Sequence, residues 1–353
     1  MTTHERFARM YAHQEADRVP FCDYPWAGTL QRWHREGLPE GIDWIEYFDL
    51  DHVAGVGVDI SPQYPQRVIE ETDEYIISTT PWGVTLKNQK QVDSTPEFLD
   101  FTVADSIRWS EAKARMTPDP SRIPWAYLQQ NYRRWREQGA WLQAQLWFGF
   151  DVTHSWFVGT ETLLMALLEE PEWCADMFDH YLDMCIALFD QVIDAGYTFD
   201  EVTWPDDMGY KNTQFFSLEI YRELVKPVQK RAIEWAHSRG MKTHLHSCGN
   251  INPFVPELIE LGLDALNPLE VKAGMDPYAL KKQYGNRLVL HGGMNAQLWD
   301  DRKACEAELR RLIPVMKQNG GYVFASDHSI PSSVSFADIQ YILRLAKELC
   351  RYD

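Results

Sequence analysis

The chain has 353 residues, 45% of them apolar, which is enough to bury one large core or two smaller ones. Its formal charge of -18, from 34 basic and 52 acidic residues, argues against nucleic acid or a membrane as a partner, because both are bound through Lys and Arg. No stretch reaches the ~18 consecutive apolar residues of a membrane span, and the N-terminus lacks an apolar signal run. We therefore expect a cytoplasmic protein with reduced cysteines.

Strand-like and helix-like runs alternate along the chain, a pattern typical of a parallel α/β fold. Strands are predicted at residues 19–24, 52–60, 141–148, 199–204, 241–246, 264–269, 287–291 and 322–326. Helices are predicted at residues 3–16, 106–115, 126–138, 161–168, 174–195, 217–238, 253–261, 277–284, 300–318 and 336–349. Pro227 predicts a kink or break inside the helix over 217–238.

Two further β-rich runs interrupt this alternation near the N-terminus. Residues 67–78 and 83–88 are separated by Thr79-Thr80-Pro81-Trp82, which predicts an inserted β-hairpin. About eight alternating strands favour a (β/α)₈ TIM barrel with this N-terminal hairpin as an insertion. An open doubly wound sheet is the alternative, but no Gly-x-Gly-x-x-Gly or Walker-type loop follows any predicted strand.

Polar and metal-capable side chains follow strand after strand, where a barrel has its active site. His246-Ser247-Cys248 is the sharpest case, because imidazole and thiolate are the preferred zinc ligands. A buried Cys beside a hydrogen-bonded His is the alternative reading of this triplet. Glu270 and His328 follow later strands, so the four side chains predict a zinc site.

Other residues at the same strand ends are candidates for catalysis and for substrate or cofactor binding. Asp206 and Asp207 could act as an acid/base group, although adjacent carboxylates on an extended chain cannot both face a pocket; loop capping is the alternative. His291 could be a further metal ligand or a hydrogen-bond donor in catalysis; a core histidine bonded to backbone is the alternative. The candidate binding residues are Asp23, Tyr24, Trp26, Trp147 and Phe148.

Five segments of the chain resemble the uroporphyrinogen decarboxylase superfamily. They are Trp-Pro-Asp-Asp-Met-Gly at 204–209, Leu-His-Ser-Cys-Gly-Asn at 245–250, Leu-Gly-Leu-Asp-Ala-Leu-Asn-Pro at 261–268, Tyr-Gly-Asn-Arg-Leu-Val-Leu-His-Gly-Gly at 284–293, and the tail 320–335. The resemblance covers nearly all of the chain, most clearly from residue 159 onward. It implies a single (β/α)₈ barrel domain over residues 1–353 and, as the usual arrangement of the family, a homodimer.

The superfamily has two main branches. The porphyrinogen decarboxylase is metal-free and binds the carboxylates of its substrate through an N-terminal segment of the type Met-Arg-Gln-Ala-Gly-Arg. Residues 19–28, the matching region here, contain no Arg and place Asp23 where guanidinium groups would bind those carboxylates.

The zinc-dependent, corrinoid-linked methyltransferases carry His-x-Cys and a second Cys about eighty residues later. His246 and Cys248 match that pattern, Glu270 fits an auxiliary ligand, and His328 stands where the second Cys is expected. An imidazole there would leave a more electrophilic ion.

The resemblance therefore implies a zinc-dependent methyltransferase that moves a methyl group between a small substrate, a thiol or a methoxy (aromatic ether) compound, and cobalamin. The chain has no Asp-x-His-x-x-Gly cobalamin-ligating segment, so the cobalamin is expected from a partner corrinoid protein. A decarboxylase acting on a tetrapyrrole is one alternative. A non-catalytic protein that binds a corrinoid or tetrapyrrole in the barrel mouth is another.

Overall fold

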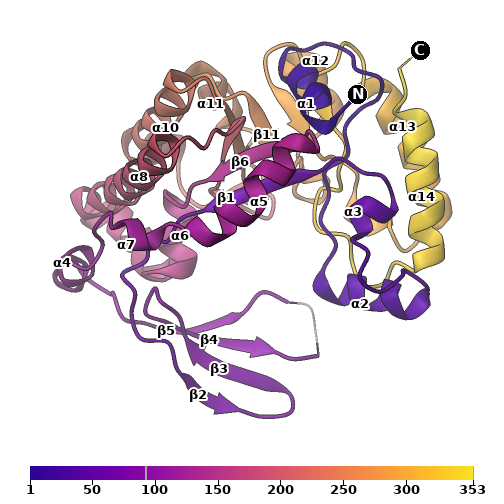
Figure 1. The fold of residues 1–353 in the computed structure, drawn as a ribbon. Coiled ribbons are helices and arrows are strands. Elements are labelled where there is room, and N and C mark those ends of the chain that lie inside the picture. The colour runs from indigo at the N-terminus through magenta and orange to yellow at the C-terminus, as the bar shows by residue number, and fades with distance from the viewer. Residues whose placement is uncertain (92–93, 353) are drawn as a thin grey trace.

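The computed structural model describes residues 1–91 and 94–352. Its centre is a curled sheet of seven strands in the order β1-β6-β7-β10-β11-β12-β13, and every neighbouring pair is parallel (Figure 1). The strands are β1 Val53–Gly57, β6 Trp141–Gln145, β7 Glu201–Pro205, β10 Lys242–His246, β11 Ala265–Asn267, β12 Val289–His291 and β13 Tyr322–Val323. Each lies within a predicted run or one residue beyond it, so the sheet order follows the chain order as in a barrel.

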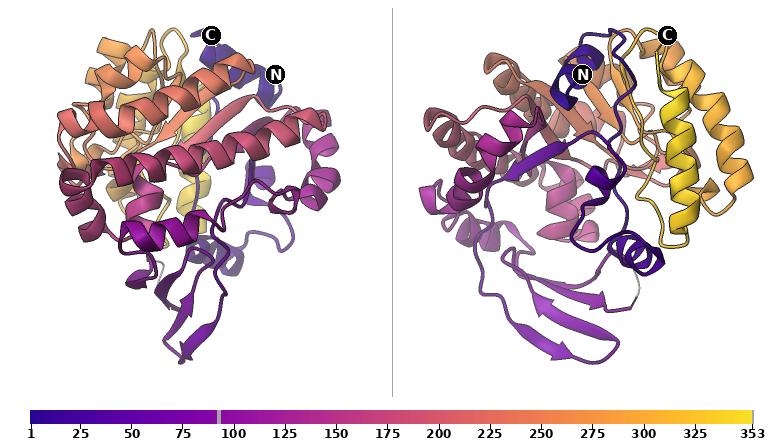
Figure 2. Two further views of the ribbon diagram at one scale, coloured as in Figure 1. Left: turned by 90° about the vertical axis from the view of Figure 1, so that its left-hand side faces the viewer. Right: turned by 45° about the vertical axis from the view of Figure 1, so that its right-hand side comes forward.

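Helices cover the outer face of the curled sheet, and α8 and α10 lie side by side along it (Figure 2). The covering helices are α5 Trp125–Glu137, α8 Pro171–Asp194, α10 Lys226–Ser238, α11 Val255–Leu261, α12 Pro277–Tyr284, α13 Arg302–Met316 and α14 Phe336–Leu349. The remaining helices are α1 Thr3–Tyr11, α2 Ala27–Glu36, α3 Trp44–Tyr47, α4 Ser106–Lys113, α6 Phe150–Trp156, α7 Thr160–Glu169 and α9 Leu218–Ile220, with single turns at Pro120–Arg122, Val271–Ala273 and Ala296–Leu298. Within the described part of the chain, no helix is both long and apolar enough to cross a membrane.

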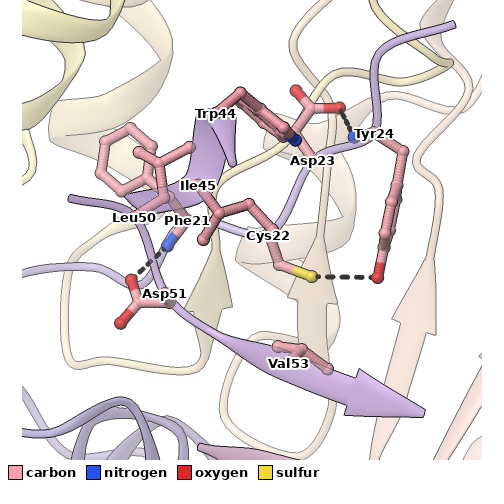
Figure 3. A pocket seen from close by; sticks show the side chains of 9 residues that line it. All are labelled: Phe21, Cys22, Asp23, Tyr24, Trp44, Ile45, Leu50, Asp51 and Val53. Carbon is pink, nitrogen blue, oxygen red and sulfur yellow. Dashed lines mark hydrogen bonds between the residues drawn. The ribbon is translucent and has the colours of Figure 1, made fainter. Parts of the chain in front are cut away.

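The eighth position of the barrel is occupied by an irregular segment, which corrects the predicted strand over residues 19–24. Its backbone pairs with the β13 side of the sheet through isolated parallel bridges, Phe21 to Phe324 and Pro25 to Ile330, and not through a continuous ladder. Pro20 and Pro25 have no N–H to donate and so cannot extend a ladder. On the β1 side, the Phe21 amide donates to the Asp51 carboxylate over 2.8 Å, beside a void of about 20 Å³ (Figure 3).

The predicted hairpin is part of a four-stranded antiparallel sheet that projects from the barrel after β1 (Figure 1). Its strands are β2 Val68–Glu71, β3 Tyr75–Thr79, β4 Val84–Gln89 and β5 Glu97–Phe101; a separate two-stranded ribbon pairs β8 Gly209–Tyr210 with β9 Thr213–Gln214. The turn predicted between β3 and β4 is correct. The run over 67–78 is two strands, because the Thr72 hydroxyl accepts the Glu74 and Tyr75 amides and turns the chain. Strand β5 was not predicted, since its side chains are largely exposed.

The break expected at Pro227 lies one turn earlier. Residues Tyr221–Val225 form a π-helical turn between α9 and α10. Pro227 has no N–H to donate to the Glu223 carbonyl, and the wider turn accommodates that missing bond without ending the helix.

Candidate metal centre at the carboxyl end of the sheet

Three adjacent strands bring the central side chains of the site together. In the register of the sheet, His246 at the end of β10 is paired with Pro205 of β7 and with Asn267 of β11. Asp207 follows β7 and Cys248 follows β10, so both lie in the loops that leave the same edge. The parallel register therefore converts residues some forty positions apart into neighbours.

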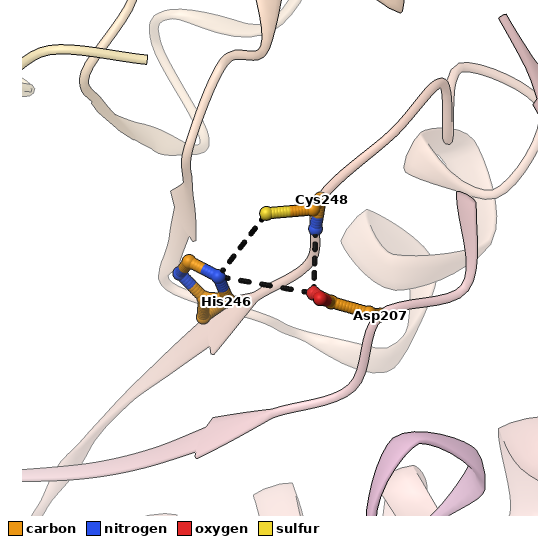
Figure 4. A group of neighbouring side chains, drawn as sticks. All are labelled: Asp207, His246 and Cys248. Carbon is orange, nitrogen blue, oxygen red and sulfur yellow. Dashed lines mark hydrogen bonds and ion pairs between the residues drawn. The ribbon is translucent and has the colours of Figure 1, made fainter. Parts of the chain in front are cut away.

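Asp207, His246 and Cys248 form the metal-capable group that the structure assembles. One ligand atom from each lies within 4.8 Å of the others. The Cys248 Sγ and Asp207 Oδ1 atoms are 3.4 Å and 3.8 Å from His246 Nε2 (Figure 4). The Cys248 backbone amide donates to Asp207 Oδ1 over 2.7 Å, which fixes the carboxylate beside the thiol.

The orientation of His246 is set by Asn267. Its Nδ1 atom lies 2.7 Å from the Asn267 side-chain oxygen, and the Asn267 amide nitrogen lies 3.3 Å from the His291 carbonyl oxygen. Because the amide nitrogen must donate to that carbonyl, the amide oxygen faces His246 and accepts its Nδ1–H. The Nε2 lone pair is then directed at Cys248 and Asp207, which is the arrangement that metal-binding histidines use.

The loop carrying Cys248 is held tightly against its neighbours. Gly249 has a φ of +79°, and a Cβ atom there would lie 2.6 Å from the Gly209 Cα. Only glycine tolerates both the left-handed backbone and this close approach. The Gly249 amide donates to the Glu270 carboxylate, whose other oxygen lies 3.3 Å from the Lys272 ammonium.

The electrostatics of this group suit a bound cation. Burial and the neighbouring Asp207 and Glu270 carboxylates raise the pKa of the Cys248 thiol well above its usual value. Burial likewise raises the pKa of Asp207, although His246 opposes that effect. A divalent ion among these donors would favour the deprotonated forms of both, because ligands bind metals as anions or neutral bases.

The donor set also fits zinc geometrically. With Zn–N and Zn–S distances of about 2.1 and 2.3 Å, tetrahedral ligands lie roughly 3.4–3.6 Å apart. The two donor separations at His246 Nε2, 3.4 and 3.8 Å, are close to that range. Three protein donors with a cavity on the remaining side is the pattern of a catalytic rather than a structural zinc site.

A cavity of about 310 Å³ opens next to the three donors. Its wall also includes Asp23, Tyr24, Trp26, Ser326, His328 and Ser329. The Asp23 carboxylate accepts the Ser326 amide (2.8 Å) and hydroxyl (2.6 Å), which ties the irregular segment to the loop after β13. The Trp26 and His328 ring centroids are 5.9 Å apart. Burial lowers the pKa of His328, so this imidazole is neutral near pH 7.

Glu270 and His328, the other two predicted ligands, do not belong to the group of three. The Glu270 carboxylate contacts the Gly249 amide and Lys272, so in this structure it supports the loop that carries Cys248. His328 stands in the cavity wall against Trp26. Their role as zinc ligands stays a prediction, whereas Asp207, predicted as a catalytic residue, has its carboxylate beside His246 and Cys248.

Several predicted site residues lie behind the cavity instead of in its wall. Asp206 is fully buried and binds the Asp151 amide and Gln229, and burial raises its pKa to about 7. His291 is buried with Nε2 2.8 Å from the Cys22 carbonyl oxygen. Phe148 is buried against Trp204, with ring centroids 5.5 Å apart. Trp147 is partly exposed beside Trp156, at 5.8 Å.

Asn267 and Ser326 are the residues of the site that sequence reasoning missed. Asn267 is one polar residue in the run Leu-Asn-Pro, and nothing local marks it as the partner of a histidine 21 positions earlier. Its place at the end of a predicted strand, next to the strand of His246, was the available signal.

The sequence model of the family described as uroporphyrinogen decarboxylase (URO-D) matches residues 154–349. The match covers more than half of the chain and includes the strands at whose ends Asp207, His246 and Cys248 lie. The chain belongs to the uroporphyrinogen decarboxylase family. No curated protein matches the sequence significantly.

Solved structures extend the likeness of this URO-D family member beyond the matched residues. A methyltransferase from Methanosarcina mazei is 14% identical, with 99% of both chains covered and a TM-score of 0.65, so the two share a fold. A B12-independent methionine synthase from Shewanella sp. W3-18-1 is 10% identical, with 95% of this chain and 97% of that chain covered. Its TM-score of 0.47 is too low to show that the two proteins share a fold.

Proposed function

We propose that this URO-D family member is a zinc-dependent methyltransferase that moves a methyl group between a small substrate and a cobalamin carried by a separate corrinoid protein. The observation that carries the proposal is the oriented group of His246, Cys248 and Asp207 at the wall of a cavity. The solved structure that covers 99% of the chain is named a methyltransferase, which agrees with this choice of activity.

His246, Cys248 and Asp207 would hold the zinc ion and leave a fourth position for the substrate. His328 in the cavity wall and Glu270 beside the Cys248 loop are further candidate ligands. Zinc bound there supplies a Lewis acid that lowers the pKa of a substrate thiol or polarises the oxygen of a methoxy group. Cys248, as a thiolate, and Asp207 would offset the charge of the ion. Asn267 holds the His246 ring so that its Nε2 lone pair, and not its N–H, faces the donors.

The cavity wall would position the substrate beside this group. Tyr24 and Trp26 on the irregular segment and His328 on the loop after β13 offer aromatic surface. The irregular segment is tied to that loop by the Asp23–Ser326 hydrogen bonds, so these rings are held at fixed positions relative to the donors. Holding reacting groups in a fixed geometry is itself a large part of catalysis.

Decarboxylation of a porphyrinogen is less well supported. A substrate with many carboxylates needs guanidinium or ammonium partners, and among the described residues that line the cavity none is Arg or Lys. Arg18, the nearest Arg in sequence before the segment, is already paired with the buried Asp51 carboxylate.

The proposal is tested by following the demethylation of methylcobalamin with a thiol acceptor, using metal-free protein before and after addition of one equivalent of zinc. We expect turnover with zinc and none without it, and no zinc-dependent turnover for Cys248→Ser. Release of carbon dioxide from uroporphyrinogen would favour the decarboxylase instead. Tight corrinoid binding without turnover, unchanged in Cys248→Ser, would favour a non-catalytic binding protein.

A further inference from the structure

The charged side chains around the cavity are mostly carboxylates, so the charge of a substrate should affect how well it binds. The carboxylates that act electrostatically on its side chains include Asp23, Asp151, Asp207, Glu270 and Asp327. The Lys272 ammonium also acts on Cys248 and His328, but it lies 3.3 Å from the Glu270 carboxylate, which compensates its charge. Every Lys and Arg of the chain belongs to the described residues, and none of them lines the cavity.

Zinc would neutralise only part of this negative charge. A divalent ion bound by the Cys248 thiolate, the Asp207 carboxylate and the neutral His246 has no net charge with its ligands. The Asp23 and Asp151 side chains then have no Lys or Arg among the hydrogen-bond partners that the structure describes, although burial raises the pKa of Asp23. Asp23 accepts from the Ser326 amide and hydroxyl and from the Tyr24 amide, and Asp151 contacts His154 and Ser155. The chain as a whole carries -18, so its long-range field has the same sign.

Aromatic rings lie at the mouth of this acidic cavity. Tyr24 lines the cavity, yet 59% of its surface is exposed, and its hydroxyl lies 3.6 Å from the Cys22 Sγ atom (Figure 3). The Trp26 ring stands opposite His328 in the same wall. Faces of Tyr and Trp attract cations through their ring quadrupoles, most strongly where the cation is desolvated, and a nearby carboxylate attracts the same cation in addition.

From the carboxylates and rings of this wall we infer that the methyl acceptor or donor is a small molecule with a cationic end, a primary or substituted ammonium. Its thiol or methoxy group would lie at His246, Cys248 and Asp207, and its ammonium at Asp23, Tyr24 and Trp26. The inference rests on the proposed function, because it takes the reacting sulfur or oxygen to be at the metal. It excludes thiols whose far end is a carboxylate or sulfonate, which would meet carboxylates with no Lys or Arg beside them.

Three thiols of similar length test it by isothermal titration calorimetry on the zinc-loaded protein: cysteamine (ammonium), 2-mercaptoethanol (hydroxyl) and 3-mercaptopropionate (carboxylate). We expect affinity to fall in that order, with the ammonium at least roughly tenfold tighter than the carboxylate. The thiols differ in intrinsic acidity, so the decisive quantity is the change in their affinity ratio between variants. Methyl transfer from methylcobalamin to each thiol gives a second readout.

Ser329→Lys places an ammonium in the cavity wall, and Ser332→Lys adds the same charge to an exposed position of the same loop. We expect the first to reduce the ammonium-to-carboxylate ratio at least roughly tenfold and the second to leave it unchanged. Tyr24→Leu should weaken cysteamine binding more than Tyr24→Phe does, because phenylalanine keeps the ring face.

A carboxylate that binds as tightly as the ammonium, or a ratio that Ser329→Lys leaves unchanged, would overturn the inference and leave the methyltransferase proposal standing. If none of the three thiols binds the zinc-loaded protein, the inference is overturned as well. Absence of zinc binding would instead overturn the proposed function itself.

Discussion

His246 and Asn267 form a hydrogen bond of 2.7 Å between two adjacent parallel strands. This contact fixes the orientation of the imidazole ring, so that the ring can act as a metal ligand. The ring nitrogen that faces Cys248 and Asp207 is thereby the unprotonated one. The candidate centre thus depends on a residue outside the group of three.

Replacing Asn267 by Ala should weaken zinc binding about 10- to 100-fold, the usual cost of removing an outer partner of a metal-bound histidine. Asn267→Asp keeps the acceptor for the Nδ1–H and should recover much of the affinity. Competition with a chromogenic chelator measures both. Equal losses in the two variants would show that the hydrogen bond to His246 is not what matters.

Gly249→Ala should disturb the centre, because its Cβ would lie 2.6 Å from the Gly209 Cα. Gly196 is a matched control: its φ is +94°, but a Cβ there meets nothing within 4 Å. Both substitutions pay the left-handed backbone cost of roughly 1–2 kcal/mol, so the free energy of unfolding should fall in each. Only Gly249→Ala should also lose zinc affinity. A similar zinc affinity in the two variants would contradict the tight packing of this loop.

Glu201, fully buried inside the barrel, should dominate the acid stability of the fold. Tyr11, Trp141 and Gln143 donate to its carboxylate over 2.5–2.7 Å, and His244 Nδ1 lies at 2.8 Å. Burial alone would raise the pKa of Glu201, but His244 and these donors lower it below its usual 4.5. Its contribution is therefore complete above pH 4.5 and is lost as the pH falls below that value.

The Glu201→Ala variant should lose roughly 3–5 kcal/mol at pH 7, since four buried donors lose their acceptor. Glu201→Gln should lose less and should also show a smaller stability difference between pH 7 and pH 4 than the wild type. Denaturant unfolding at the two pH values measures this. An unchanged pH dependence in Glu201→Gln would show that this carboxylate is not the group responsible.

Cys248 should be the most reactive thiol of the metal-free protein. It is the half-buried cysteine of the six, the other five being buried. Burial raises the pKa of Cys248 as it does that of Cys22, Cys174, Cys185 and Cys305, so the access to Cys248 from the cavity, and not its acidity, favours its reaction. A disulfide reagent should label about one thiol quickly, zinc should slow that labelling, and Cys248→Ser should abolish the fast phase. Fast labelling that persists in Cys248→Ser would place the reactive thiol elsewhere.

The sequence predicts the sheet well where strands are apolar and followed by glycine-ended helices, as from β7 to β13. It fails at residues 19–24, where Pro20 and Pro25 interrupt an otherwise strand-like run, and at β5, whose exposed side chains lack an apolar pattern. In both places, whether the segment pairs as a strand depends on neighbours that are distant in sequence, and the local pattern does not report this.

For the site, His246 and Cys248 were identified from their spacing and residue types. The sequence could not decide between Asp206 and Asp207, because the direction of each side chain depends on the loop after β7. The structure buries Asp206 against Gln229 and turns Asp207 into the cavity. Asn267 was missed because its contact with His246 comes from strand register, which a single sequence does not specify.

The central claim is that His246, Cys248 and Asp207 hold zinc, and metal content after purification and dialysis tests it most directly. We predict about one zinc ion per wild-type chain, little in His246→Gln and Cys248→Ser, and a reduced amount in Asp207→Asn. Cys305→Ala, at a buried thiol in α13 away from the centre, should retain a full equivalent. A wild-type protein that binds no zinc when supplied with it, or a Cys248→Ser variant that binds it as tightly as the wild type, would contradict the account.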